Sequence, residues 1–71
     1  MAVVKVIELI GSYPNSWEEA ARNAVAKAAE TIRNIVGAEV VSQTAAVKDG
    51  RITEYRANMK IAFVVEEIAA G

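Results

Sequence analysis

The chain of 71 residues contains neither cysteine nor histidine. The absence of cysteine excludes disulfides, thiolate nucleophiles and cysteine-ligated zinc, and the absence of histidine excludes imidazole acid–base chemistry and the commonest transition-metal ligand. Catalysis would then need a carboxylate pair, or a lysine or serine activated by its surroundings. Ser12, Ser16 and Ser42 belong to a predicted turn, helix cap and strand, and none has the context of a nucleophile elbow. The sequence therefore predicts that the protein is not an enzyme.

The chain also lacks a strong excess of charge and a long apolar run. Its formal net charge of −1 favours no class of partner, and it shows no basic patch of the kind that binds nucleic acid. Lys5 and Glu8 interrupt the apolar residues near the N-terminus, so the sequence predicts neither a secretory signal nor a membrane span. We expect a soluble cytoplasmic protein with no nucleic-acid or membrane partner.

The clearest pattern is an alternation of side chains over residues 52–65, which predicts a long strand with one apolar and one polar face. The apolar side carries Thr53, Tyr55, Ala57, Met59, Ile61, Phe63 and Val65, and the polar side carries Glu54, Arg56, Asn58 and Lys60. Such a strand is roughly 45 Å long, whereas a helix over residues 16–34 covers about 27 Å. The helix cannot cover the sheet, so the remaining apolar surface predicts a homo-oligomer.

The other predicted elements complete a β-α-β-β order in one α+β domain. A β-branched strand over residues 3–10 ends at turn formers, and Ser16 with Glu19 forms a capping box that starts a helix at Trp17 and carries it to about Asn34. A strand over residues 38–47 follows, and Asp49-Gly50 predicts a tight hairpin to the long strand. We expect a three-stranded antiparallel sheet wrapped around one helix, in a single domain over residues 1–71 with 68–71 as a loose tail.

Four segments of the chain resemble the dodecin family. They are residues 4–12, the helix start at 16–21, the strand at 38–41, and residues 55–63. The resemblance implies a β-α-β-β chain that assembles into a hollow homododecamer, and for many members the storage of flavins between symmetry-related tryptophans. Flavin, as riboflavin or FMN, is thus one expected ligand.

The family's flavin positions are carried over one at a time by this resemblance. Gly37 stands where the stacking tryptophan is found, Arg56 replaces the glutamine that bonds the flavin's pyrimidine edge, and Ala46 stands at an acidic contact position. Asn58, on the same polar side as Arg56, completes the pocket region. Glycine offers no ring face and arginine cannot accept a hydrogen bond, so the resemblance implies a weakened flavin site.

The chain is more similar to a subgroup without the tryptophan, described as calcium-type dodecins, in residues 14–18 and at Arg56. Calcium needs six to eight oxygen ligands, and the chain has no EF-hand spacing. A site would have to be built across subunits, with Glu8, Glu39 and Asp49 as the candidate ligands. A purely structural shell is a further alternative.

A third possible ligand is coenzyme A or another phosphate-bearing cofactor. Arg51, Arg56 and Lys60 lie on or near the polar side of the long strand, where guanidinium groups can pair with phosphate. The alternative use of these cations is a ladder of cross-strand salt bridges. The sequence thus predicts a homo-oligomeric binder of a small molecule or ion and leaves the ligand open.

Overall fold

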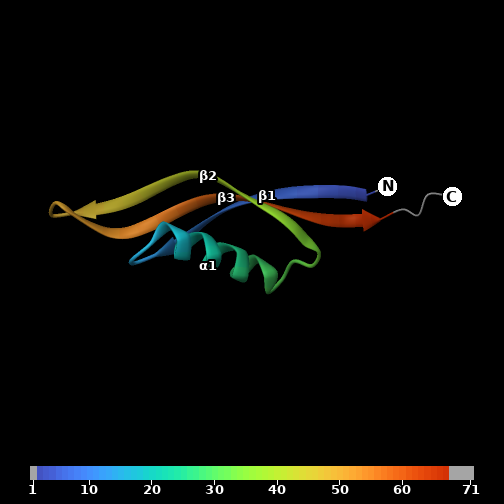
Figure 1. The fold of residues 1–71 in the computed structure, drawn as a ribbon, viewed down its shortest axis with the longest axis horizontal. Coiled ribbons are helices and arrows are strands. Elements are labelled where there is room, and N and C mark those ends of the chain that lie inside the picture. Colours follow the sequence, from blue (N-terminus) through green and yellow to red (C-terminus); the bar gives the residue numbers. More distant parts are fainter. Residues whose placement is uncertain (1, 68–71) are drawn as a thin grey trace.

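The computed structural model describes residues 2–67. Its elements are β1 (Ala2–Tyr13), α1 (Trp17–Ala29), β2 (Ile35–Lys48) and β3 (Arg51–Glu67), as Figure 1 shows. This is the predicted β-α-β-β order, and each strand is longer than its predicted range. The tail predicted at 68–71 lies outside the described residues.

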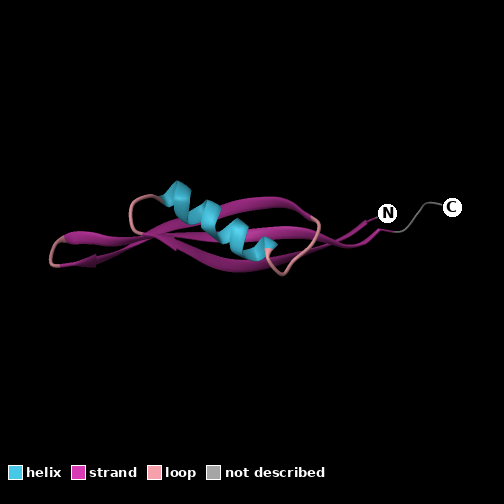
Figure 2. Ribbon diagram, turned by 90° about the horizontal axis from the view of Figure 1, so that it is seen from below, coloured by secondary structure: helices cyan, strands magenta, loops and turns pink. Residues whose placement is uncertain are grey.

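The three strands form one antiparallel sheet in the order β1-β3-β2, so the long strand β3 lies in the centre. The helix α1 packs on one face of the sheet and crosses the strands obliquely (Figures 1 and 2). The β2–β3 hairpin lies at one end of the molecule, and the start of β1 and the end of β3 lie at the other. The predicted three-stranded antiparallel sheet with one helix is confirmed, and with extents of 61 × 20 × 14 Å the chain is long and narrow.

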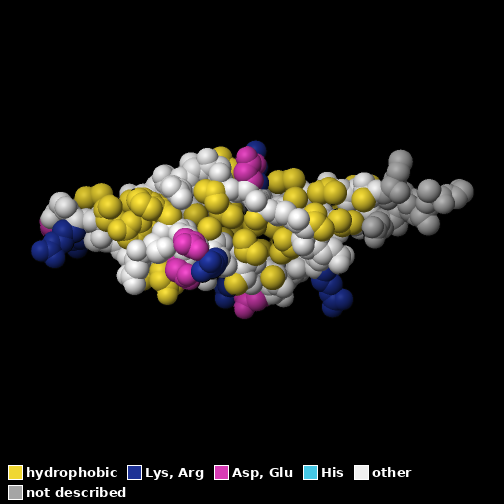
Figure 3. Space-filling view, viewed as in Figure 1, with side chains coloured by type: hydrophobic (Ala, Val, Ile, Leu, Met, Phe, Trp, Pro, Cys, Tyr) yellow, Lys and Arg dark blue, Asp and Glu magenta, His cyan; other side chains and the backbone are white. Residues whose placement is uncertain are grey.

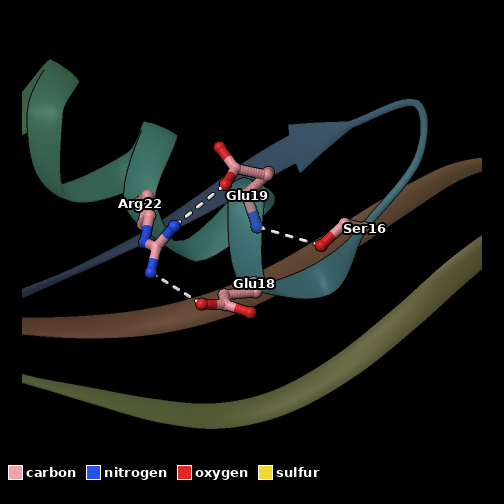
Figure 4. A network of polar contacts seen from close by, with 4 residues as sticks. All are labelled: Ser16, Glu18, Glu19 and Arg22. Carbon is pink, nitrogen blue, oxygen red and sulfur yellow. Dashed lines mark hydrogen bonds and ion pairs between the residues drawn. The ribbon is translucent and has the colours of Figure 1, made fainter.

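The helix begins where the capping pattern predicts. The Ser16 hydroxyl accepts a hydrogen bond of 3.2 Å from the Glu19 backbone N–H (Figure 4). The Glu19 carboxylate accepts from Arg22 at 3.0 Å, and Arg22 also donates to Glu18 at 2.7 Å. The predicted serine cap is therefore confirmed, and the Glu19 carboxylate forms an ion pair with Arg22 one turn further along the helix.

The helix ends at Ala29 rather than at the predicted Asn34, which is a correction. The backbone N–H groups of Glu30 and Thr31 bond carbonyls three residues back, which tightens the last turn. Asn34 adopts a left-handed conformation with φ of 62° and redirects the chain, so β2 already begins at Ile35. The helix is thus shorter than predicted, and it leaves even more of the sheet uncovered.

The core is small and rich in alanine. Its buried hydrophobic residues within the described chain are Ala20, Ala24, Ala28, Ala57, Met59 and Ile61. The alanine face of α1 lies directly on Gly11 of β1, where an added Cβ atom would stand 2.2 Å from the Ala20 carbonyl oxygen. The predicted apolar parity of β3 is confirmed under the helix, but Val65, beyond the helix, is 51% exposed.

Much of the apolar surface stays uncovered. The large hydrophobic side chains that remain exposed are Val3, Val4, Val6, Ile10, Tyr13, Val36, Val40, Val41, Val47, Ile52 and Val65. In Figure 3 hydrophobic side chains extend along the molecule beyond both ends of α1. Monomeric proteins seldom expose contiguous apolar surface on this scale, so this surface matches the predicted need for a partner copy.

Candidate functional site

The polar side chains of β3 lie on the face of the sheet that points away from α1, which we call the open face. The strand register places residues of β1 and β2 beside them in rows across the sheet. In the order β1, β3, β2 the rows are Val6, Ala62 and Gly37; Glu8, Lys60 and Glu39; Ile10, Asn58 and Ser42; Ser12, Arg56 and Thr44; a last row pairs Glu54 with Ala46. These rows carry three carboxylates and two cations.

All four ligand positions predicted from the resemblance lie on the open face. Arg56 and Asn58 occupy neighbouring rows, but Gly37 and Ala46 stand four rows apart. Four rows correspond to roughly 27 Å at about 3.4 Å per residue, which is longer than a single ring system. One chain therefore does not bring these positions together, and a pocket that uses all of them needs a second copy of the open face.

Arg56 already has a partner on its own strand. Its Nη2 lies 3.2 Å from Glu54 Oε2, and both side chains are partly exposed. Hydrogen bonding from Arg56, and next from Ser12, lowers the pKa of the Glu54 carboxyl below its ordinary value, while burial opposes the shift. A ligand that recruits Arg56 must compete with this carboxylate.

We expect the carboxyl carbon of Glu54 to titrate below pH 4.5, the ordinary value for glutamate, in an NMR titration of the folded protein. Because the folded-state pKa is lowered, the ion pair stabilises the fold above that value, and its contribution is lost as the pH falls through the folded pKa. In an Arg56→Met variant the midpoint should move back towards 4.5. An unchanged midpoint in that variant would show that Arg56 does not cause the shift.

Asn58 is held differently. Its Nδ2 donates to the Ser42 hydroxyl at 2.7 Å, whereas its Oδ1 is buried without a hydrogen-bond partner in the described chain. A shallow hollow of about 280 Å³ lies beside it, lined by Glu8, Leu9, Ile10, Val41, Asn58 and Met59. Asn58 therefore combines an unused polar atom with a concave, partly apolar surface.

The candidate calcium ligands are only partly brought together. Glu8 and Glu39 share one row and flank Lys60, whose Nζ lies 4.0 Å from Glu8 Oε1. Asp49 lies in the hairpin turn with φ of 52°, far along the sheet from that row. Across residues 2–67 no group of three or more acidic side chains is placed to hold a metal ion. In the row of Glu8 and Glu39, Lys60 lies beside a carboxylate, as Arg56 does in its own row.

Trp17, the one tryptophan of the chain, packs within the chain. Its Nε1–H donates to the Thr44 carbonyl at 2.8 Å, and its ring meets that of Tyr55 edge to face at 4.6 Å. These two contacts fix the start of α1 over the sheet. The ring is thus used in packing within the chain and does not replace the stacking tryptophan that the resemblance places at position 37.

Comparisons with known proteins agree with this architecture. The family model described as Dodecin matches residues 3–66. The chain belongs to the dodecin family. The predicted resemblance is thereby confirmed, and with it the predicted fold class. Dodecins are homo-oligomeric ligand-binding proteins and are not known as enzymes.

This dodecin is similar to a calcium dodecin and to other dodecins of known structure. It is 44% identical to the calcium dodecin of Mycobacterium tuberculosis over 64 residues, which is 89% of each chain. The solved structure of that calcium-chelating antigen, with a novel calcium-binding site, matches with a TM-score of 0.80 at 37% identity and covers 97% of this chain and 99% of that one. The dodecin of Streptomyces coelicolor matches with a TM-score of 0.88 at 30% identity, covering 94% and 96%.

Sequence reasoning missed Ser42, the hydrogen-bond partner of Asn58. Lys48 pairs with Arg51 across the Asp49-Gly50 turn of this dodecin. A hairpin without irregularities would continue this pairing one residue at a time and would place Val41 opposite Asn58. The register instead shifts between Ala46 and Val47 and back between Val40 and Ser42. These irregularities lack a local sequence signal such as a glycine.

In the part of the chain that the structure describes, no helix is long and apolar enough to cross a membrane.

Proposed function

We propose that this dodecin assembles in the cytoplasm as a hollow homododecamer that binds and stores a small ligand of the flavin type on its open faces. The observation that carries the proposal is the spread of Gly37, Ala46, Arg56 and Asn58 along one face, too far apart to meet within a chain. Symmetry-related copies of the face would supply one pocket together. The relation to dodecins supports this reading.

The energetics of the single chain support an obligatory assembly. Within residues 2–67, four of the six buried core residues are alanines, Ala20, Ala24, Ala28 and Ala57, which bury little area each. The uncovered valines on both sides of α1 would supply the missing burial when copies meet. A chain of this size without disulfides gains its stability most readily from such contacts.

The flavin affinity of this shell should be lower than that of members with a stacking ring. Gly37 contributes no ring face, and an added Cβ atom there would meet only Ala62 at 3.9 Å, so the position is open. Stacking on an aromatic side chain is worth about 1–3 kcal/mol per nucleobase where it has been measured. The shell would therefore act as a weak buffer for its ligand.

Calcium binding is the second candidate function. Its support is the 44% identity to a calcium dodecin and the placement of Glu8 and Glu39 in one row. A symmetry axis would multiply these carboxylates, and Asp49 would have to come from another copy. A phosphate-bearing cofactor such as coenzyme A has less support, since Arg56 and Lys60 already face Glu54 and Glu8.

Native mass spectrometry of the purified protein tests the assembly and the ligand together. We expect twelve chains with the mass of a retained small molecule or of calcium ions. Calcium as the ligand also predicts that a chelator lowers the melting temperature, because binding to the folded state alone stabilises it. A monomer at micromolar concentration would overturn the proposal. A twelve-mer without ligand mass, with a melting temperature that a chelator does not change, would leave only the structural shell.

A further inference from the structure

We propose that Asn15, in the loop between β1 and α1, is a site of spontaneous deamidation. In this reaction the backbone nitrogen of Ser16 forms a bond to the Asn15 Cγ atom, and the bond from Cγ to the side-chain nitrogen breaks. The proton of the Ser16 N–H group leaves with that nitrogen as ammonia. Water then opens the resulting succinimide ring to aspartate or isoaspartate. The reaction needs no other reactant, and the inference is independent of the proposed ligand and assembly.

The side chain of Asn15 is accessible and unrestrained. Asn15 is exposed and lies between the end of β1 at Tyr13 and the start of α1 at Trp17. Within residues 2–67 its carboxamide neither donates nor accepts a hydrogen bond. It can therefore rotate about its side-chain torsions until Cγ lies over the next backbone nitrogen. Water can also reach the ring that forms.

The attacking nitrogen is left free by the ion pair at the start of α1. In a complete capping box the Glu19 carboxylate would accept a hydrogen bond from the Ser16 backbone N–H. That carboxylate instead accepts from Arg22 at 3.0 Å and points away from Ser16 (Figure 4). Among the described residues the Ser16 N–H has no acceptor. No carboxylate therefore opposes the loss of its proton.

The other three asparagines of the chain are protected against the same attack. Asn23 lies within α1 and Asn58 within the central strand β3, where the backbone is held in a regular hydrogen-bonded conformation. Both of their carboxamides donate hydrogen bonds within the chain. Asn34 is followed by Ile35, and the branched Cβ atom of isoleucine crowds the nitrogen that would have to attack. The structure thus singles out Asn15.

The modification would change the start of α1 in two ways. Both products add one negative charge to a chain whose formal net charge is −1. An aspartate here is favourable, because it stands near the positive end of the helix dipole. Isoaspartate instead carries the main chain through the former side chain, so it adds a backbone atom directly before Ser16. This longer connection should disturb the cap, in which Ser16 Oγ lies 3.2 Å from the Glu19 nitrogen.

Incubation of the purified wild-type protein in a warm, mildly alkaline buffer tests the inference. We expect a more acidic form to accumulate with time on isoelectric focusing, together with released ammonia. Peptide mapping by mass spectrometry should place the change at Asn15. No acidic form, or an acidic form that maps to another asparagine, would overturn the inference. The native mass of the same sample tests the proposed shell separately, so the two proposals can fail independently.

Three variants test the chemistry of the reaction. Asn15→Gln should abolish the acidic form, because its longer side chain closes a ring onto the next nitrogen far more slowly. Ser16→Thr is the matched variant: threonine keeps a capping hydroxyl, but its branched Cβ should slow the reaction several-fold. Arg22→Met should also slow it, because the Glu19 carboxylate is then free to bind the Ser16 N–H.

An unchanged rate in Ser16→Thr would overturn attack by the Ser16 nitrogen. An unchanged or faster rate in Arg22→Met would overturn the role given to the ion pair. If a variant does not fold, the peptide map of the wild-type protein decides alone whether Asn15 is the modified residue.

Discussion

Replacing Gly11 with alanine is expected to destabilise this dodecin more than any other single methyl addition to its glycines. The new Cβ atom would lie 2.2 Å from the Ala20 carbonyl oxygen and 2.7 Å from the Ala24 Cβ. Both atoms belong to the face of α1 that packs on the sheet, and the first is backbone, so neither can turn away. The helix must lift off β1, which opens the core around Ala20 and Ala24.

The size of the effect follows from overpacking a rigid contact. Extra methyl groups in tight cores cost about 1–3 kcal/mol and more where the backbone must move, so we expect a loss of at least about 3 kcal/mol. In a domain of this size that corresponds to a fall in melting temperature of more than about 10 °C. Thermal unfolding at a fixed chain concentration measures it, since assembly makes the melting temperature depend on concentration.

Gly37→Ala is the matched control for this experiment. The same added atom at position 37 meets only the Ala62 Cβ, at the ordinary contact distance of 3.9 Å. We expect its melting temperature to stay close to that of the wild type. A Gly11→Ala protein that melts like this control would show that α1 does not rest on Gly11 as closely as the structure indicates.

The sequence predicted the fold well because its signals are local and mutually consistent. The serine cap sets the start of α1, and the Asp49-Gly50 turn joins β2 to β3, with φ of 52° and 75° at its two residues. The alternation in β3 predicts which side chains α1 covers, and Ala57, Met59 and Ile61 are indeed buried. Each signal depends on spacing within a few residues, so sequence alone can reveal it.

The end of the helix and the strand register depend on tertiary structure instead. The apolar spacing of α1 continues to Ile32, yet the helix ends at Ala29 and Ile32 packs against the core from a loop. Asn34 turns the chain there, because β2 must reach its place beside β3. The bulges near Val36 and Val41 likewise fit the strands to the twist of the sheet. Neighbouring residues do not encode such adjustments.

The sequence predicted which face of the sheet carries the candidate site, but not the contacts between side chains on that face. Strand parity places Arg56 and Asn58 on the polar side, which the structure confirms. The pairing of Asn58 with Ser42 depends on the bulge at Val41, and the contact between Lys60 and Glu8 depends on β1 lying beside β3. Such cross-strand contacts could not be predicted from the order of residues along the chain.

Gly37→Trp is expected to raise the affinity for riboflavin by roughly ten- to a hundredfold. The substitution restores an aromatic face at the position where flavin-binding relatives are expected to carry one, and stacking is worth about 1–3 kcal/mol per ring. The structure has room for it: Gly37 is free of a left-handed φ, and its nearest neighbour is Ala62. The side chain would extend over the hollow lined by Val6, Glu39 and Lys60.

Quenching of riboflavin fluorescence on titration with the variant measures this gain, and Gly37→Leu is the control for apolar bulk without a ring face. We expect the leucine variant to gain much less, because it buries area but cannot stack. Equal gains in the two variants would mean that flavin is held by burial alone. No gain with tryptophan, in a shell of unchanged mass, would mean that the rings of neighbouring copies do not meet across the open face.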